Sequence, residues 1–342
     1  MINTLIIDDS ALSRDIIRDF LEEDSSFRII GEAVDGEDGI QKILSLNPDL
    51  VTLDIEMPKK NGLEVIEAVM KETSVPIVVI TNHDTAKTAY EATLKGALEF
   101  YPKNIFTASL SPEKRREIYD TLKRISGIKT RKTKAPVEPY QESCPSNLPM
   151  KRPICAVVIA SSTGGPKALS TILSHLPDNF SVPIVIVQHN SSGFYKSFAQ
   201  WLDTFTGLTV KLAEDGEILK QGTVYIAETD KHLELRRKNE NHFYLCYNSD
   251  EAENNQKPSA DVLFRSAAES LQSSVISLVL TGMGCDGALG TMKINEMGGI
   301  TLAQDEESSL IYGMPKAASE TGCVDMSLPL DRIAGELQRL IK

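Results

Sequence analysis

A pair of serines lies where an apolar segment of the sequence meets a glycine-rich turn. Ser161 and Ser162 follow the apolar run 154–160 and precede Thr-Gly-Gly-Pro and a helix-like pattern. Such a serine can cap the helix, the turn can hold a phosphate on its backbone N–H groups, or one hydroxyl can act as a nucleophile. A nucleophile requires a base within hydrogen-bonding reach and a third group that orients that base.

A histidine and an aspartate could supply those two groups. His189 ends the apolar run 182–189 and follows Ser162 by 27 residues, about the length of a strand–helix–strand unit. Asp286 lies just beyond a third apolar run, 275–282. The carboxyl ends of parallel strands meet at one edge of a sheet, so these positions predict a Ser–His–Asp triad. Its chain order differs from that of the α/β-hydrolases, and no G-x-S-x-G motif is present.

The segment around Asp286 also matches a dinucleotide-binding pattern. Gly282, Gly284 and Gly287 form G-x-G-x-x-G, and Asp305 follows 18 residues later. However, the Asp286 carboxylate would project where a pyrophosphate must lie, which is electrostatically costly. The motif also begins too late in the chain to lead a complete dinucleotide fold. We therefore favour the triad over NAD(P) binding.

The first half of the chain carries a second set of reactive side chains, each at the end of a strand-like run: Asp8 and Asp9, Asp54, Thr81 and Lys103. Carboxylates that converge on one sheet edge repel each other unless a cation lies among them, and oxygen ligands suit Mg²⁺. A divalent ion, a lysine and a hydroxyl around one aspartate can stabilise a transferring phosphoryl group. Helix capping would explain one or two of these acids but not the whole set.

Alternating strand-like and helix-like segments predict the elements that position both sets. In the first half the strand-like runs are 3–8, 28–34, 49–55, 75–81 and 97–103, and the amphipathic stretches are 11–24, 36–46, 62–72, 85–95 and 111–125. In the second half the strand-like runs are 153–160, 182–189, 223–228, 275–282 and 298–305, and the helix-like stretches are 166–175, 194–205, 260–271 and 287–297. Both halves predict a doubly wound, mainly parallel α/β sheet. Residues 232–247 predict an antiparallel hairpin that turns at 239–241.

Charge divides the chain into two acidic bodies and a short basic connector. Residues 1–127 and 153–342 each carry a net charge of −8, whereas 128–152 carry +4. The connector is rich in proline and lacks strand or helix periodicity, so we expect a linker at 128–152 between domains at 1–127 and 153–342. Two acidic domains argue against nucleic acid as a partner.

Cysteine usage and hydropathy predict a cytoplasmic protein. The five cysteines are odd in number and include no C-x-x-C pair, which argues against a disulfide framework or a zinc site. The N-terminal residues do not form a signal peptide. No apolar run approaches the roughly 20 residues of a membrane span, so we expect no membrane insertion.

The first half resembles the receiver domain of two-component response regulators. The resemblance rests on "LIIDDS", "VTLDIEMPKKNGLEVI", "VVIT" and "KGALEFYPK". It implies a five-stranded, flavodoxin-like fold in which Asp54 accepts the phosphoryl group. Metal ligands are implied at Asp8, Asp9, Asp54 and the backbone carbonyl of Glu56, phosphoryl contacts at Thr81 and Lys103, and an aromatic switch at Phe100. One departure is Asn104, where the family usually has proline.

The whole chain resembles the protein-glutamate methylesterases of bacterial chemotaxis (the CheB family). The carriers are "SSTGGPKAL", "VQHNSSGFYKSFAQWL", "PSADVLFRSAA", "LTGMGCDGALG" and "AQDEESSLIYGMPKAA", together with 213–235. In that family the serine directly before Thr-Gly-Gly is the nucleophile, which implies Ser162, and an oxyanion donor is implied at Met283. Ala160, Ser161 and Cys285 depart from the usual residues without removing a catalytic group.

This resemblance implies a phosphorylation-regulated hydrolase that demethylates glutamate methyl esters on chemoreceptors. Mg²⁺ is expected in the receiver domain for phosphorylation, and no cofactor for the esterase reaction. The expected partners are methyl-accepting chemoreceptors as substrates and a chemotaxis histidine kinase as phosphodonor. Deamidation of receptor glutamines by the same route is a second reaction that the sequence does not decide. We also expect the unphosphorylated receiver to inhibit the esterase.

Overall fold

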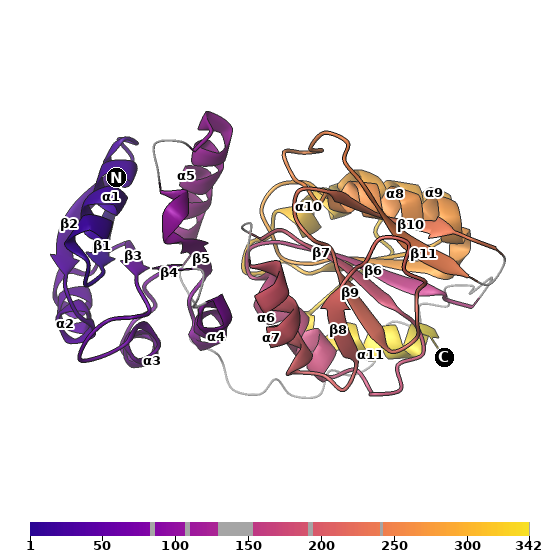
Figure 1. Ribbon diagram of the computed structural model, residues 1–342, viewed down its shortest axis with the longest axis horizontal. Coiled ribbons are helices and arrows are strands. Elements are labelled where there is room, and N and C mark those ends of the chain that lie inside the picture. Colours follow the sequence, from indigo (N-terminus) through magenta and orange to yellow (C-terminus); the bar gives the residue numbers. More distant parts are fainter. Residues whose placement is uncertain (83–85, 107–109, 129–152, 191–193, 240–241, 342) are drawn as a thin grey trace. The chain divides into compact units, whose positions relative to one another are not determined.

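The computed structural model describes residues 1–341 except 83–85, 107–109, 129–152, 191–193 and 240–241. The chain forms two compact units, Met1–Pro149 and Met150–Lys342. The expected linker lies almost entirely outside the described residues, so its boundaries stay a prediction. Figure 1 shows each unit as a sheet covered by helices on both faces.

The first unit alternates strands and helices in the order expected from the sequence. Its elements are β1 (Ile2–Ile7), α1 (Ala11–Glu22), β2 (Phe27–Ala33), α2 (Gly36–Leu46), β3 (Leu50–Leu53), α3 (Gly62–Glu72), β4 (Ile77–Thr81), α4 (Ala86–Lys95), β5 (Glu99–Pro102), the 3₁₀ turn Lys103–Ile105 and α5 (Pro112–Ser126). The described strands form a parallel sheet in the order β2-β1-β3-β4-β5. Helices α1 and α5 cover one face, and α2, α3 and α4 cover the other (Figure 1).

The central strands β3 and β4 of the first unit are buried on both faces, as strands that helices cover on both sides must be. All four residues of β3 and all five of β4 are buried. Polar side chains begin where these strands end, at Asp54 after β3 and at Thr81 as the last residue of β4. The fold therefore delivers the reactive side chains to the carboxyl edge of the sheet.

The second unit is built around a larger parallel sheet. Its elements are β6 (Ala156–Ser161), α6 (Gly165–Ser174), β7 (Ile184–Gln188), α7 (Tyr195–Asp203), β8 (Thr209–Leu212), β9 (Thr223–Ile226), β10 (His232–Arg237), β11 (Phe243–Asn248), α8 (Ala260–Leu271), the 3₁₀ turn Gln272–Ser274, β12 (Val275–Val279), α9 (Ala288–Glu296), β13 (Ile300–Gln304), α10 (Met314–Glu320), β14 (Met326–Leu328) and α11 (Leu330–Ile341). The described strands of the main sheet run β14-β13-β12-β6-β7-β9-β8.

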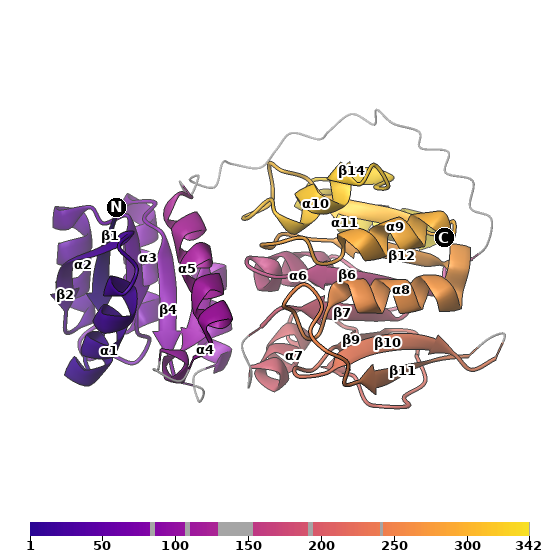
Figure 2. The ribbon, with the colours of Figure 1, turned by 90° about the horizontal axis from the view of Figure 1, so that it is seen from above.

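Two layers of helices enclose this sheet. Helices α8, α9 and α10 lie on one face, and α6, α7 and α11 lie on the other (Figures 1 and 2). Strands β10 and β11 pair antiparallel, which confirms the predicted hairpin, although residues 240 and 241 of its turn lie outside the described part. Strand β10 of this pair packs against α8. Strands β8 and β14 and helices α10 and α11 were not predicted.

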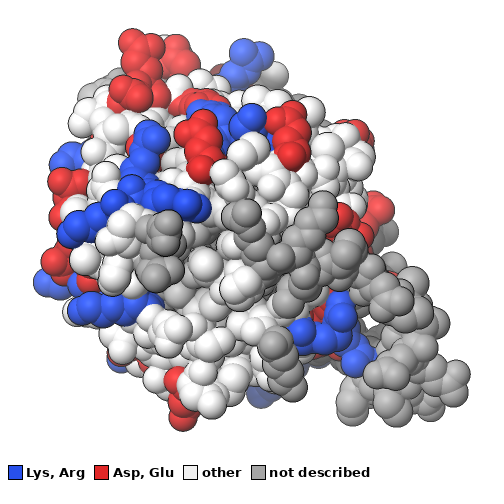
Figure 3. Space-filling model, turned by 90° about the vertical axis from the view of Figure 1, so that its right-hand side faces the viewer, with Lys and Arg blue, Asp and Glu red and all other residues white. Residues whose placement is uncertain are grey.

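Charged side chains are mixed on the face of the molecule drawn in Figure 3. Lysine and arginine side chains lie among aspartate and glutamate side chains there, with uncharged residues between them. Several described basic side chains have acidic partners, such as Arg265 with Glu253 and Lys211 with Glu217.

Candidate active site

Parallel pairing brings the predicted nucleophile and base to adjacent strand ends. Ser161 is the register partner of Gln188, the last residue of β7, so Ser162 and His189 are the next residues on neighbouring strands. The backbone N–H of His189 donates to the carbonyl of Ser161 at 2.9 Å. On the other side of β6 lies β12, whose following loop carries Asp286. The three residues of the predicted triad therefore share the carboxyl edge of this sheet.

His189 and Asp286 are in direct contact although 97 residues separate them. Nε2 of His189 lies 2.9 Å from Oδ2 of Asp286, and the two side chains are 8% and 2% exposed. A buried aspartate that bonds one ring nitrogen fixes the tautomer and the orientation of the imidazole. The other ring nitrogen, Nδ1, is buried and has no hydrogen-bond partner among the described residues.

The N-terminus of helix α8 holds the Asp286 carboxylate. The backbone N–H groups of Ala260 and Asp261 donate to Oδ2 and Oδ1 at 2.7 and 3.0 Å, and the Ser259 hydroxyl donates to Oδ1 at 2.7 Å. Unpaired N–H groups at a helix start favour an anion. Burial by itself would raise the pKa of Asp286, but the hydrogen bonds from His189, Ser259 and Ala260 outweigh it and lower that pKa to about 2.

The turn that carries Ser162 packs tightly against the loop after β12. The N–H of Ser162 donates to the Thr281 carbonyl at 3.1 Å. A Cβ on Gly282 would lie 2.7 Å from the Cβ of Ser162, closer than side chains approach each other, so glycine is required there. Met283, the expected oxyanion donor, follows Gly282 directly in the chain.

The expected departures from the family pattern are accommodated in different ways. Ala160 is fully buried. A Cβ placed on Gly287 would lie 3.4 Å from the Cβ of Ala160, which is an ordinary van der Waals contact, so the extra carbon of Ala160 crowds nothing there. Ser161 is also fully buried, and its hydroxyl donates to Oε1 of Gln188 at 2.7 Å. Cys285 is exposed. None of these side chains displaces a residue of the predicted triad.

The N-terminal reactive set also meets at one edge. Lys103 Nζ donates to Asp54 Oδ2 at 2.7 Å and forms an ion pair with Asp8 Oδ2 at the same distance. Burial would lower the pKa of Lys103, but its two carboxylate partners outweigh burial and raise it. Burial raises the pKa of Asp8, and the nearby Asp54 charge acts in the same direction. Asn104, the departure from proline, lies in the 3₁₀ turn and does not keep Lys103 from Asp54.

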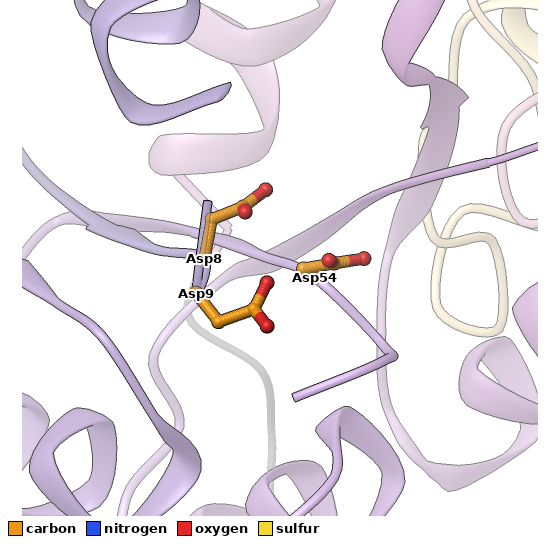
Figure 4. A group of neighbouring side chains, drawn as sticks. All are labelled: Asp8, Asp9 and Asp54. Carbon is orange, nitrogen blue, oxygen red and sulfur yellow. The ribbon is translucent and has the colours of Figure 1, made fainter. Parts of the chain in front are cut away.

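The side chains of Asp8, Asp9 and Asp54 lie beside one another at this edge (Figure 4). Each offers a carboxylate oxygen, and these oxygens all lie within 4.8 Å of one another. Three carboxylates with oxygen donors and partial exposure fit a hard divalent cation such as Mg²⁺. A Cβ on Gly62 would lie 2.4 Å from the Asp54 carbonyl, so this glycine lets the start of α3 approach Asp54.

The remaining predicted residues of this set lie around the same edge. Thr81 ends β4 and is 1% exposed, and Phe100 in β5 is buried with its ring edge-on to Tyr90 at 4.8 Å between centroids. Glu56 follows β3, and its side chain is exposed. The group expected to bind metal there is its backbone carbonyl.

Several residues that support Asp286 were missed by sequence reasoning. Ser259 donates to Asp286, and its own N–H donates to Nδ1 of His232, a fully buried histidine whose Nε2 lies 2.8 Å from the Glu251 carbonyl. Asp261 accepts from the Gly290 N–H at 2.6 Å, which ties α8 to α9. Ser259 and Asp261 lie in the block "PSADVLFRSAA" and His232 in 213–235, both carriers of the resemblance, but these segments do not reveal the roles of the three residues.

Each of the two units is matched by a model of a known protein family. The family model described as CheB methylesterase matches residues 157–337, and the response regulator receiver domain model matches 4–112. Among the described residues, none of the helices combines the length and hydropathy that a bilayer crossing requires.

Two curated relatives are named protein-glutamate methylesterase/protein-glutamine glutaminase. The protein from Thermotoga maritima is 37% identical over 100% of this chain and 99% of its own length, and that from Geobacillus kaustophilus is 38% identical over 99% of both. The crystal structure of the Thermotoga maritima CheB methylesterase catalytic domain is 44% identical with a TM-score of 0.53 and covers 55% of this chain and 98% of that domain. The chain therefore belongs to the CheB methylesterase family, with a response regulator receiver domain in front of its methylesterase domain.

Proposed function

We propose that this protein hydrolyses the methyl esters of glutamate side chains on chemoreceptors and releases methanol. The observation that carries the proposal is the buried bond from His189 to Asp286 at the strand edge that also bears Ser162. Membership of the CheB methylesterase family and relatives named for this reaction support the same substrate class.

The proposed mechanism uses Nδ1 of His189 as the general base. Asp286 is ionised near neutral pH because its pKa is about 2, so Nε2 carries the ring proton and its N–H donates a hydrogen bond to Oδ2 of Asp286. Nδ1 then keeps a lone pair, and it has no hydrogen-bond partner among the described residues. It takes the proton of the Ser162 hydroxyl as Oγ attacks the ester carbonyl, and it returns that proton to methanol when the C–O bond breaks.

Acyl-enzyme hydrolysis completes the cycle. Nδ1 removes a proton from water, the resulting hydroxide attacks the acyl carbon, and the proton returns to Ser162 Oγ as the glutamate carboxylate leaves. Backbone N–H groups near Ser162, with Met283 as one donor, stabilise the oxyanion in both steps. A glutamine side chain follows the same route with ammonia as leaving group, which accounts for the second name of the relatives.

Regulation is proposed to act through Asp54. Asp8, Asp9, Asp54 and the Glu56 carbonyl would hold Mg²⁺, which when bound neutralises charge on a phosphoryl donor. The Asp54 carboxylate accepts the phosphoryl group from the kinase, and Lys103, released from its ion pair, contacts the new phosphoryl oxygens together with Thr81. The added charge of roughly −1.5 to −2 shifts the receiver to a state that no longer restrains the esterase.

The test of this proposal is methanol release from methylated receptor membranes. The full-length protein is assayed with and without a small-molecule phosphodonor. Methanol release that rises with the donor supports both parts of the proposal. A protein that begins at Pro153 tests the inhibition separately, because inhibition requires it to be faster than the unphosphorylated full-length protein. Absence of methanol under all conditions contradicts the esterase proposal.

A further inference from the structure

Gln188 joins the backbone of the proposed nucleophile to that of the proposed base. Its side-chain Nε2 donates to the carbonyl of Ser162 at 3.0 Å and to the carbonyl of His189 at 2.9 Å. Its Oε1 accepts the Ser161 hydroxyl at 2.7 Å. Gln188 is 1% exposed, so all its polar atoms are satisfied inside the protein.

The surrounding donors and acceptors fix one orientation of this amide. The opposite orientation would place Oε1 against two carbonyl oxygens and leave Nε2 facing the Ser161 hydroxyl. Gly165 makes room for the side chain, because a Cβ at that position would lie 2.0 Å from Oε1. The position of the amide is therefore set from three sides.

The contacts of Gln188 begin where the strand pairing ends. The last ladder bond between β6 and β7 runs from the His189 N–H to the Ser161 carbonyl. Beyond it β6 ends in a turn, in which the Gly165 N–H donates to the Ser162 carbonyl at 2.7 Å. The Gln188 amide therefore links the two chains past the end of the ladder, where it binds the residue that would attack and the residue that would accept the proton.

We propose that Gln188 is a positioning residue that sets the distance between Ser162 and His189 during catalysis. The inference rests on the proposed serine esterase mechanism. Proton transfer requires the hydroxyl and the ring nitrogen to be held within hydrogen-bonding reach, and a misplacement of about 1 Å costs on the order of 100-fold in rate. The Ser161 hydroxyl in turn holds Oε1 of Gln188, which gives this departure from the family pattern a supporting role.

The test compares Gln188→Met with a variant that loses buried hydrogen bonds elsewhere in the same sheet. Methionine keeps the length of the side chain and removes both donors. Thr301→Val is the matched control, because Thr301 is fully buried near the amino end of β13 and its hydroxyl bonds Cys323 and Asp325. Four quantities are measured on the full-length proteins: kcat and KM for methanol release, the rate at which a fluorophosphonate labels Ser162 as a function of pH, and the melting temperature.

We expect Gln188→Met to lower kcat by at least about tenfold with KM changed less than about twofold. The pH dependence of Ser162 labelling flattens, because a displaced imidazole no longer controls the reactivity of the hydroxyl. Thr301→Val lowers the melting temperature and leaves kcat and the labelling profile unchanged. The proposal is overturned if Gln188→Met keeps the kcat and labelling profile of the parent well below its melting temperature, or if Thr301→Val shows the same losses.

Gln188→Glu tests the positioning role of Gln188 if the methionine variant does not fold. Glutamate keeps the shape and the acceptor for Ser161 but presents oxygen to both carbonyls, so the same loss in labelling is expected. Failure of the esterase proposal is distinguishable, because the parent protein itself would then release no methanol. The labelling rates would still report whether Gln188 controls the reactivity of Ser162.

Discussion

Nε2 of His189, and not Nδ1, is the ring nitrogen that lies 2.9 Å from Asp286 Oδ2. The nitrogen that faces away from the aspartate is therefore Nδ1, which lies closer to the backbone of the histidine. This relationship follows from where Asp286 is held, at the start of α8 by the N–H groups of Ala260 and Asp261. The helix start anchors the carboxylate, and the carboxylate orients the ring.

Replacing Asp286 by asparagine should lower kcat for methanol release by about 10³- to 10⁴-fold, through loss of the correct tautomer. Both oxygens of Asp286 accept backbone N–H groups of α8, so either orientation of the asparagine places its NH₂ group against an N–H donor. The measurement is kcat on methylated receptor membranes. A kcat within about tenfold of that of the parent protein would contradict the triad.

The two adjacent serines should differ sharply when each is replaced by alanine. Ser162→Ala removes the proposed nucleophile, and methanol release should fall to the background of the assay. Ser161→Ala removes one buried bond to Gln188 Oε1, while both Nε2 bonds of Gln188 remain, so most activity should persist. Methanol assays on both variants, with fluorophosphonate labelling, make the comparison. A dead Ser161→Ala protein that is folded would show that the nucleophile has been assigned to the wrong serine.

The sheet edges could be predicted from the sequence because strand ends follow from apolar runs. Ser162 and His189 directly follow β6 and β7, and Asp54 directly follows β3, as the runs implied. The doubly wound, parallel α/β fold of each unit was confirmed (Figure 1). Strands β8 and β14 were missed because they are short and partly exposed, and lack the continuous apolar run that marks the equally short but buried strands β3 and β9. Helix α11 was also missed, although Ile333, Leu337 and Leu340 show the spacing of an amphipathic helix.

The supporting contacts of the candidate site could not be predicted in the same way. Ser259, His232 and Asp261 lie in or beside elements that reach Asp286 through tertiary packing, and no local pattern links them to it. The sequence shows that Gln188 precedes His189. It does not show that the side-chain amide of Gln188 bonds the carbonyls of Ser162 and His189 beyond the end of the strand. Such contacts are set by packing in three dimensions rather than by spacing along the chain.

Removing divalent metal should abolish the response to a phosphodonor and leave basal turnover intact. The three carboxylates Asp8, Asp9 and Asp54 converge within 4.8 Å in the first unit, whereas the proposed esterase mechanism uses only side chains and backbone groups of the second unit. Methanol release is measured with and without acetyl phosphate, before and after EDTA, with excess Mg²⁺ added back as control. Asp54→Asn should show no stimulation under any of these conditions. Stimulation that survives EDTA would contradict a metal-dependent phosphorylation.

The pH dependence of stability should report the buried carboxyl of Asp261. Burial raises its pKa to about 6, and the neighbouring Asp286 charge adds to the effect. A carboxyl whose pKa is higher in the folded protein binds its proton more tightly there, so its stabilising contribution is complete below the ordinary pKa of 3.8 and is lost as pH rises through about 6. Asp286 behaves oppositely, because its pKa of about 2 makes its contribution complete above 3.8. The two groups therefore act in different pH ranges.

Asp261→Asn should remove this dependence between pH 4 and 7. Relative to the variant, the parent should lose on the order of 3 kcal/mol of unfolding free energy across that range. Urea unfolding is followed by the fluorescence of Trp201, the single tryptophan of the chain, which is buried in the second unit. The difference between parent and variant cancels the titration of histidines common to both. Parallel stability profiles would mean that the Asp261 carboxyl is already ionised at pH 4 in the folded protein, and that the bonds from Gly290 and Asn254 outweigh its burial.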